Sequence, residues 1–269
     1  MRRLYLRRLP GFFAFVAATA VAAAACAADM PVPGPAYTSH AYMPPAAYNW
    51  SGVYFGASVG GNVMNDSVTM TPLLPGFVTS GTVTNLHPFG LVGGPQAGFN
   101  VEFAPIVVGF EGTWTASNIS GTQSTPPGFG GFSEQSTSAA HWYWTATGRI
   151  GFAANDLLFY AKGGGAWMRV DYTQAVTAGG IVSQQTIADN RHGYTVGGGI
   201  EYGLTENISA KIEYDYLGFG TKNYTFATLS AGPGAPTPVA AAIKSYTQLF
   251  TAGMNYRFTW GGGGYAAKY

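Results

Sequence analysis

Residues 208–216 read Ile208-Ser-Ala-Lys-Ile-Glu-Tyr-Asp-Tyr216, an alternation of apolar and polar side chains. Successive side chains of a β-strand point to opposite faces of the sheet. A strand over these residues therefore has one face of Ile, Ala and Tyr and an opposite face that carries Lys211, Glu213 and Asp215. A period of two predicts a β-strand over 208–218.

Seven further segments show the same period: 53–63, 89–103, 107–116, 141–152, 157–168, 193–202 and 245–258. Each is long enough to provide the 9–11 residues with which a tilted strand crosses a bilayer. Short connections at 104–105, 153–156 and 203–207 alternate with long ones at 64–88, 117–140, 169–192 and 219–244. Short periplasmic turns and long outer loops are typical of outer-membrane barrels. The pattern predicts an all-β protein, an eight-stranded antiparallel transmembrane β-barrel with four long outer loops.

The composition supports a membrane protein that crosses with strands. Only 9% of the residues are charged and 15% are aromatic, whereas soluble domains carry about 25% charged residues. After the N-terminus no apolar run reaches the roughly 18 residues of a transmembrane helix. A soluble β-sandwich also has strands of period two and remains the alternative, although it does not need an aromatic face on nearly every strand.

The N-terminus has the organisation of a secretory signal peptide. Four arginines precede an apolar stretch that ends in Ala25-Cys-Ala27, which predicts a signal peptide over 1–27 and a mature protein in the outer membrane. Cleavage after Ala28, an uncleaved helix and a lipoprotein acylated at Cys26 are the alternatives. Cys26 is the only cysteine, so the mature protein is expected to have no disulfide.

The remaining chain divides into three parts. Residues 28–49 are rich in Pro and Tyr and predict an extended periplasmic linker; 50–258 form the barrel, and 259–269 form a Gly-rich C-terminal tail. Loss of the four signal arginines leaves nine Lys and Arg against 12 Asp and Glu, a net charge of about −3. This balance gives no reason to expect a nucleic acid as a partner.

The charged residues of the strands lie on the face opposite the aliphatic and aromatic residues. Because a charge that faces lipid is costly and a buried charge needs a partner, we expect them to form a network that fills the narrow interior. The network comprises Glu102, Glu111, Arg149, Lys162, Glu201, Lys211, Glu213, Asp215 and Arg257. The lipid face is expected to carry the girdle residues Trp50, Trp142, Trp144, Trp167, Tyr194, Tyr202, Tyr214, Tyr216 and Tyr256.

Chemistry beyond this network has little support in the sequence. His40, His87, His141 and His192 fall in the linker, in the long connections or near strand ends. His141 or His192 beside a Ser or Asp could imitate the site of a small-barrel lipid A acyltransferase or deacylase, but solvated rim histidines are the preferred interpretation. No metal-ligand spacing is present. We therefore predict no enzyme activity, no metal and no cofactor.

Several motifs resemble alphaproteobacterial outer-membrane β-barrel proteins of the OmpA type. They are Asn49-Trp-Ser-Gly-Val-Tyr-Phe-Gly-Ala-Ser-Val-Gly60, Gly93-Gly-Pro-Gln-Ala-Gly-Phe-Asn100, Thr147-Gly-Arg-Ile-Gly151, Val196-Gly-Gly-Gly-Ile-Glu-Tyr202, Lys211-Ile-Glu-Tyr-Asp-Tyr216 and Ala252-Gly-Met-Asn-Tyr-Arg-Phe258. The likeness covers about residues 48–269. The family that it indicates includes porin-family surface antigens, some of them reported to bind haem.

The resemblance implies further expectations. Tyr256 and Phe258 in the closing strand correspond to the signal that the barrel-assembly machinery recognises, although Phe258 is followed here by a tail. The expected surroundings are outer-membrane lipid and lipopolysaccharide, with loops that could meet a small ligand or a host surface. The predicted function is a structural or surface role in the cell envelope with a plugged interior. The alternative is a narrow porin or a ligand-uptake barrel that binds haem through its outer loops.

Overall fold

The computed structural model describes residues 48–72, 83–124, 133–178, 180–226 and 239–258. All of them belong to one compact unit that begins at Ala46. Its elements are strands: β1 (Gly52–Pro72), β2 (Val83–Leu86), β3 (Phe89–Phe103), β4 (Ile106–Ser124), β5 (Ser133–Ala154), β6 (Leu157–Ala178), β7 (Ile181–Gly203), β8 (Ile208–Phe226) and β9 (Val239–Phe258). Among the described residues, none belongs to a helix long and apolar enough to cross a membrane.

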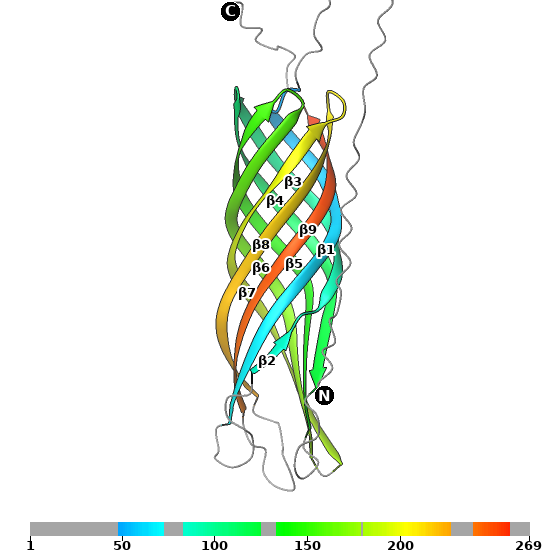
Figure 1. The fold of residues 1–269 in the computed structure, drawn as a ribbon, viewed down its shortest axis with the longest axis vertical. Coiled ribbons are helices and arrows are strands. Elements are labelled where there is room, and N and C mark those ends of the chain that lie inside the picture. Colours follow the sequence, from blue (N-terminus) through cyan, green and yellow to red (C-terminus); the bar gives the residue numbers. More distant parts are fainter. Residues whose placement is uncertain (1–47, 73–82, 125–132, 179, 227–238, 259–269) are drawn as a thin grey trace, which may run out of the picture. The chain divides into compact units, whose positions relative to one another are not determined.

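The strands form one antiparallel sheet that closes on itself. Each long strand pairs with its neighbours in the chain, and β1 pairs with β9 from Val53–Phe258 to Pro72–Val239 (Figure 1). The short strand β2 pairs with Asp66–Thr69 of β1, while β3 pairs with Gly52–Val63 of the same strand. β2 and β3 therefore occupy one position in the ring, and the predicted eight-stranded barrel is confirmed.

The strands are longer than the sequence pattern predicted. The predicted loops 64–88, 117–140, 169–192 and 219–244 are largely strand, because β1, β4, β5, β6, β7, β8 and β9 all continue into them. Their Ser, Thr, Gly and Gln residues are typical of loops, yet apolar side chains still alternate among them. Of the predicted loops there remain 87–88 and 180, which are described, and 73–82, 125–132, 179 and 227–238, which lie outside the described residues.

The barrel reverses its polarity along its length. Near the short turns, apolar side chains such as Ile212 (61% exposed) point outward and charged side chains point inward. In the other half, toward the long connections, the interior is an apolar cluster that includes Met64, Met168, Leu217 and Phe226. Most outward positions there carry polar residues, although Val182 is 64% exposed. The half near the short turns is therefore suited to lipid. The half near the long connections is suited to water, and we call it the outer half because long connections of such barrels lie outside the cell.

Irregularities in two strands help to bring apolar residues inside the outer half. In β5 the register shifts between Ala140 and Trp142. On the side of the long connections, even-numbered residues such as Ser138 point inward. On the side of the short turns, odd-numbered residues such as Tyr143 do so. β8 shifts in the same way between Gly218 and Thr221. One inserted residue exchanges the two faces of a strand, because the side-chain period is two.

The ring is continuous only in the membrane half. Pairing between β7 and β8 ends at Tyr194–Gly218, and pairing between β3 and β4 ends at Val92–Ser117. Above these points the described strands form two sheets, one of β8, β9, β1 and β2 and one of β4, β5, β6 and β7. Both sheets contribute residues to the apolar cluster.

The reversal of polarity predicts different costs for the same substitution in the two halves. Ile212→Arg places a charge in the lipid-facing band and is expected to destabilise the protein by about 2–4 kcal/mol, since arginine is most costly near the middle of the bilayer. Gln184→Arg on the exposed face of the outer half is the matched control and is expected to change stability by less than about 0.5 kcal/mol. Urea unfolding in lipid vesicles measures both, and equal costs would contradict the assignment of the two halves.

Candidate functional site: the charged interior of the barrel

The strand alternation brings the interior charges together from five strands. Glu111 of β4, Arg149 of β5, Lys162 of β6 and Glu201 of β7 point inward, as do Lys211, Glu213 and Asp215 of β8. Glycines on the same face leave room for longer side chains. A Cβ on Gly98 would lie 2.4 Å from the Tyr54 hydroxyl, and one on Gly199 would lie 2.7 Å from the Tyr160 hydroxyl.

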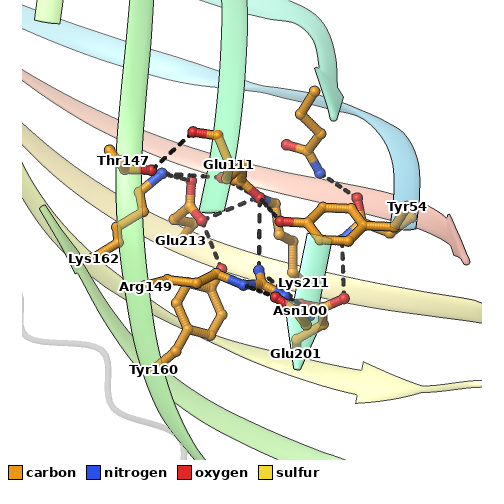
Figure 2. Close-up of polar contacts among 12 residues, drawn as sticks. Tyr54, Asn100, Glu111, Thr147, Arg149, Tyr160, Lys162, Glu201, Lys211 and Glu213 are labelled. Atoms are coloured by element: carbon orange, nitrogen blue, oxygen red, sulfur yellow. Dashed lines mark hydrogen bonds and ion pairs between the residues drawn. The ribbon is translucent and has the colours of Figure 1, made fainter. Parts of the chain in front are cut away.

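Glu111 is the centre of this network (Figure 2). Its carboxylate lies 3.1 Å from Lys211 Nζ, 3.4 Å from Lys162 Nζ and 3.6 Å from Arg149 Nη1. The Tyr54 hydroxyl donates a hydrogen bond of 2.9 Å to the same group. A carboxylate with no exposed surface thus has three cations and one hydroxyl around it, which offsets the cost of its removal from water.

Glu213 and Asp215 share the same lysines. Lys162 Nζ lies 2.6 Å from Glu213 Oε1 and 3.0 Å from Asp215 Oδ2. Lys211 Nζ lies 3.0 Å from Glu213 Oε2, and the Tyr160 hydroxyl donates to this carboxylate at 2.6 Å. Each lysine thus contacts more than one acid. Removal of a single acid therefore leaves the buried network with one positive charge in excess.

Glu201 extends the network toward the short-turn end. Both terminal nitrogens of Arg149 lie 3.3 Å from Glu201 Oε2, and Ser209 and Asn255 donate to Oε1 at 2.5 and 2.9 Å. Arg257 Nη2 lies 3.9 Å from the same oxygen. Four acids and four bases are therefore in contact, and the network carries no net charge when all are ionised.

Arg149 also lies between two aromatic rings. Its guanidinium carbon is 4.8 Å from the ring centre of Tyr54 and 5.0 Å from that of Tyr160. Its Nε donates to Asn100 Oδ1 at 2.8 Å. These contacts hold the guanidinium plane across the interior, where arginine can bind carboxylates and stack at the same time.

The nine residues predicted for the interior do not all meet. Eight lie in the connected set, while Glu102 is half-buried near the end of β3 and accepts a hydrogen bond of 2.9 Å from the Trp50 backbone. Tyr256 and Phe258 lie on the outer face of β9 at 48% and 45% exposure. Their ring centres are 4.9 Å apart, and β9 ends at Phe258.

The prediction that Trp50 belongs to the lipid-facing girdle was wrong. Trp50 is fully buried, and its Nε1 donates to the Asn155 backbone at the turn between β5 and β6. Tyr48, assigned to the linker, is also buried, with its ring 4.5 Å from that of Trp50. Arg257 lies 4.8 and 5.0 Å from the two ring centres. Tyr48 and Trp50 form an aromatic cap over the short-turn end of the interior.

A second polar cluster lies in the outer half, where the sequence predicted loops. Asp66 of β1 accepts hydrogen bonds from Ser138 and Ser245 and is almost fully buried. Arg191 of β7 donates to the Phe219 and Gly220 carbonyls of β8 at 3.1 and 2.8 Å, and so connects strands that no longer pair there. Both residues are in phase with the inward face of their strand, and that phase was the signal available in the sequence.

The histidines do not share a site. His141 Nε2 lies 3.0 Å from Asp171, His87 Nδ1 lies 2.6 Å from Asn65 Oδ1, and His192 is exposed. His40 lies outside the described residues. Within the described ranges, no group of three or more His, Cys, Asp or Glu residues is arranged to hold a metal ion.

Comparison with known proteins identifies the family. Residues 49–262 match the model of the OmpA-like transmembrane domain. A 31 kDa outer-membrane immunogenic protein of Brucella melitensis is 30% identical over 208 residues, 75% of this chain and 84% of the relative. A 25 kDa outer-membrane immunogenic protein of the same species is 27% identical over 245 residues, 90% and 92% of the two chains.

A solved structure supports the fold. The outer membrane protein OprG from Pseudomonas aeruginosa has a TM-score of 0.50 at 12% identity, over 80% of this chain and 100% of that one. Together with the family match and the closed ring of strands, these findings place the protein in the cell outer membrane. The chain belongs to the family of OmpA-like transmembrane domains.

Proposed function

We propose that this protein is a closed, non-enzymatic barrel with a structural and surface role in the outer membrane. The observation that carries the proposal is the charged network centred on Glu111, whose side chains cross the interior and are nearly all buried. An eight-stranded barrel has an interior just wide enough for its own side chains. An ion would have to separate these paired charges in order to pass.

Two further layers support a closed interior. The aromatic cap covers the network on the short-turn side, and the apolar cluster around Met64, Leu217 and Phe226 fills the outer half. An apolar barrier and a neutral, paired charge layer oppose ions by different means. Both would have to open in a narrow porin, which is the alternative function.

The outer half forms the surface that the protein exposes to water outside the cell. It extends the strands well beyond the roughly 11 residues that cross a bilayer, with polar side chains outward. The relatives from Brucella are named as immunogenic outer-membrane proteins. A water-exposed extension of paired strands presents this protein's surface in the same way to molecules outside the cell.

The closed interior predicts very low ion conductance. The purified protein in planar lipid bilayers is expected to give no steady single-channel openings in 1 M KCl. A stable open level of a defined size in most insertions would overturn the proposal and favour the narrow porin.

The same network predicts a large loss of stability from one substitution. Glu111→Gln leaves Lys211, Lys162 and Arg149 with one acid too few and is expected to cost about 3–5 kcal/mol, the range for a broken buried ion pair. Glu206→Gln in the exposed turn between β7 and β8 is the matched control. Urea unfolding in vesicles compares them. A loss below about 1 kcal/mol for Glu111→Gln would show that the network does not hold the interior together.

We also propose that Tyr256 and Phe258 form the recognition signal for the barrel-assembly machinery. Phe258→Ala is expected to lower the amount of heat-modifiable protein in outer membranes severalfold, while the purified variant still folds in detergent. Phe250→Ala, at a phenylalanine on the same strand that is at least as exposed (58% against 45%), is expected to assemble normally. Equal losses in the two variants would assign the effect to lipid contact instead of recognition.

A further inference from the structure

A row of three tyrosines crosses the outer face of β7, β8 and β9. Tyr194 and Tyr216 have ring centres 6.2 Å apart, and Tyr216 and Tyr246 have ring centres 5.7 Å apart. Gly218 pairs with both Tyr194 and Tyr246, and a Cβ there would lie 2.7 Å from the Tyr194 ring. The absent side chain lets the rings approach one another. We call Tyr194, Tyr216 and Tyr246 the tyrosine row.

The tyrosine row lies at the boundary between the two halves. Ile212 and Phe250 are exposed below it, on the lipid-facing side, and the ladder between β7 and β8 ends at the row. Tyrosine places its apolar ring in the acyl region and its hydroxyl among the headgroups. The row is thus at the depth of the lipid headgroups of the outer leaflet.

An exposed lysine lies directly above the row. Lys244 is two residues from Tyr246 on the same face of β9 and pairs in register with Thr221. In the described part of the chain no carboxylate lies within ion-pair distance of Lys244. The other outward cations differ: Lys222 Nζ is 2.7 Å from Asp189, and Arg169 Nε is 3.8 Å from Asp171. Lys244 is therefore available for an anion from outside the barrel.

An apolar groove lies below the row on the same strands and on β1. Two hollows of about 500 and 720 Å³ share Val59, Ile200, Ile212 and Ala252, so they are continuous. The upper one begins at Tyr214 and Phe250, and the lower one ends at Tyr202 and Met254. Small outward residues, among them Ala252, form its floor. Its length along the strands and its apolar lining suit a hydrocarbon chain.

We propose that this face of β7, β8, β9 and β1 binds a phosphorylated, acylated glycolipid of the outer leaflet. Lys244 pairs with a phosphate, the hydroxyls of the tyrosine row contact the sugar headgroup, and one acyl chain lies in the groove. The order of cation, amphipathic rings and apolar groove along the barrel matches the order of phosphate, sugar and chain in such a lipid. This site is outside the barrel and is independent of the closed interior.

Native mass spectrometry of the purified, delipidated protein in detergent tests the site. The probes are bis-phosphorylated lipid A and the same lipid without phosphates. Lys244→Gln is expected to weaken binding of the phosphorylated probe about fivefold, the effect of one lysine near an anionic lipid surface, and to leave binding of the other probe unchanged. Arg169→Gln, whose cation already has an acid beside it, is the matched control and is expected to bind like the wild type.

A second pair of variants tests the groove. Ala252→Phe fills it and is expected to weaken binding of both probes, whereas Ala161→Phe on the lipid face of β6 leaves binding unchanged. The gel shift between unboiled and boiled samples shows that each variant is folded. The proposal is overturned if Lys244→Gln binds the phosphorylated probe like the wild type, if Arg169→Gln loses as much, or if Ala252→Phe and Ala161→Phe behave alike. None of these outcomes bears on conductance, which tests the interior separately.

Discussion

Backbone amides and carbonyls that face hydrocarbon have no water to bind, so a sheet in a membrane is stable only when its edges pair with each other. Here that requirement is met where β1 and β9, the first and last strands, pair along their whole length. Closure fixes eight positions around a narrow interior and leaves each strand one inward and one outward face. The lipid-facing aromatics, the interior charges and the glycines that make room for them all follow from this geometry.

Inward and outward side chains alternate along every strand, but the inward ones are polar in the membrane half and apolar in the outer half. In the membrane the solvent is apolar, so the polar side chains lie inside and satisfy one another, as Glu111 does with its three cations. Outside the membrane the solvent is water, and apolar side chains such as Phe226 lie inside. The requirement for a closed edge ends with the hydrocarbon, which accounts for the separation of β7 from β8 and of β3 from β4 above that level.

Much of this could be predicted from the sequence because a period of two is a local property. Phase, together with the cost of a charge that faces lipid, predicts the interior position of five charged residues that the structure brings together: Glu111, Arg149, Lys162, Glu201 and Lys211. Glu102 has the same phase but lies near the end of its strand, where no cation of the described residues is within ion-pair distance. Phase also places Trp50 inward with Tyr54, although its aromatic character favoured a lipid-facing position.

What the sequence could not show is where the polarity reverses. The shifts at Ala140/Trp142 and Gly218/Thr221 each depend on one inserted residue. In β8 the shift includes Gly220 at φ 68°, but a single glycine in a chain that contains 39 of them does not identify the position. The shifts also have an evolutionary consequence. Above them the outward side chains contact neither lipid nor the charged interior, so substitutions there are limited mainly by solubility. A lineage under pressure from antibodies or phages could alter this exposed surface residue by residue while the membrane barrel beneath it stayed the same.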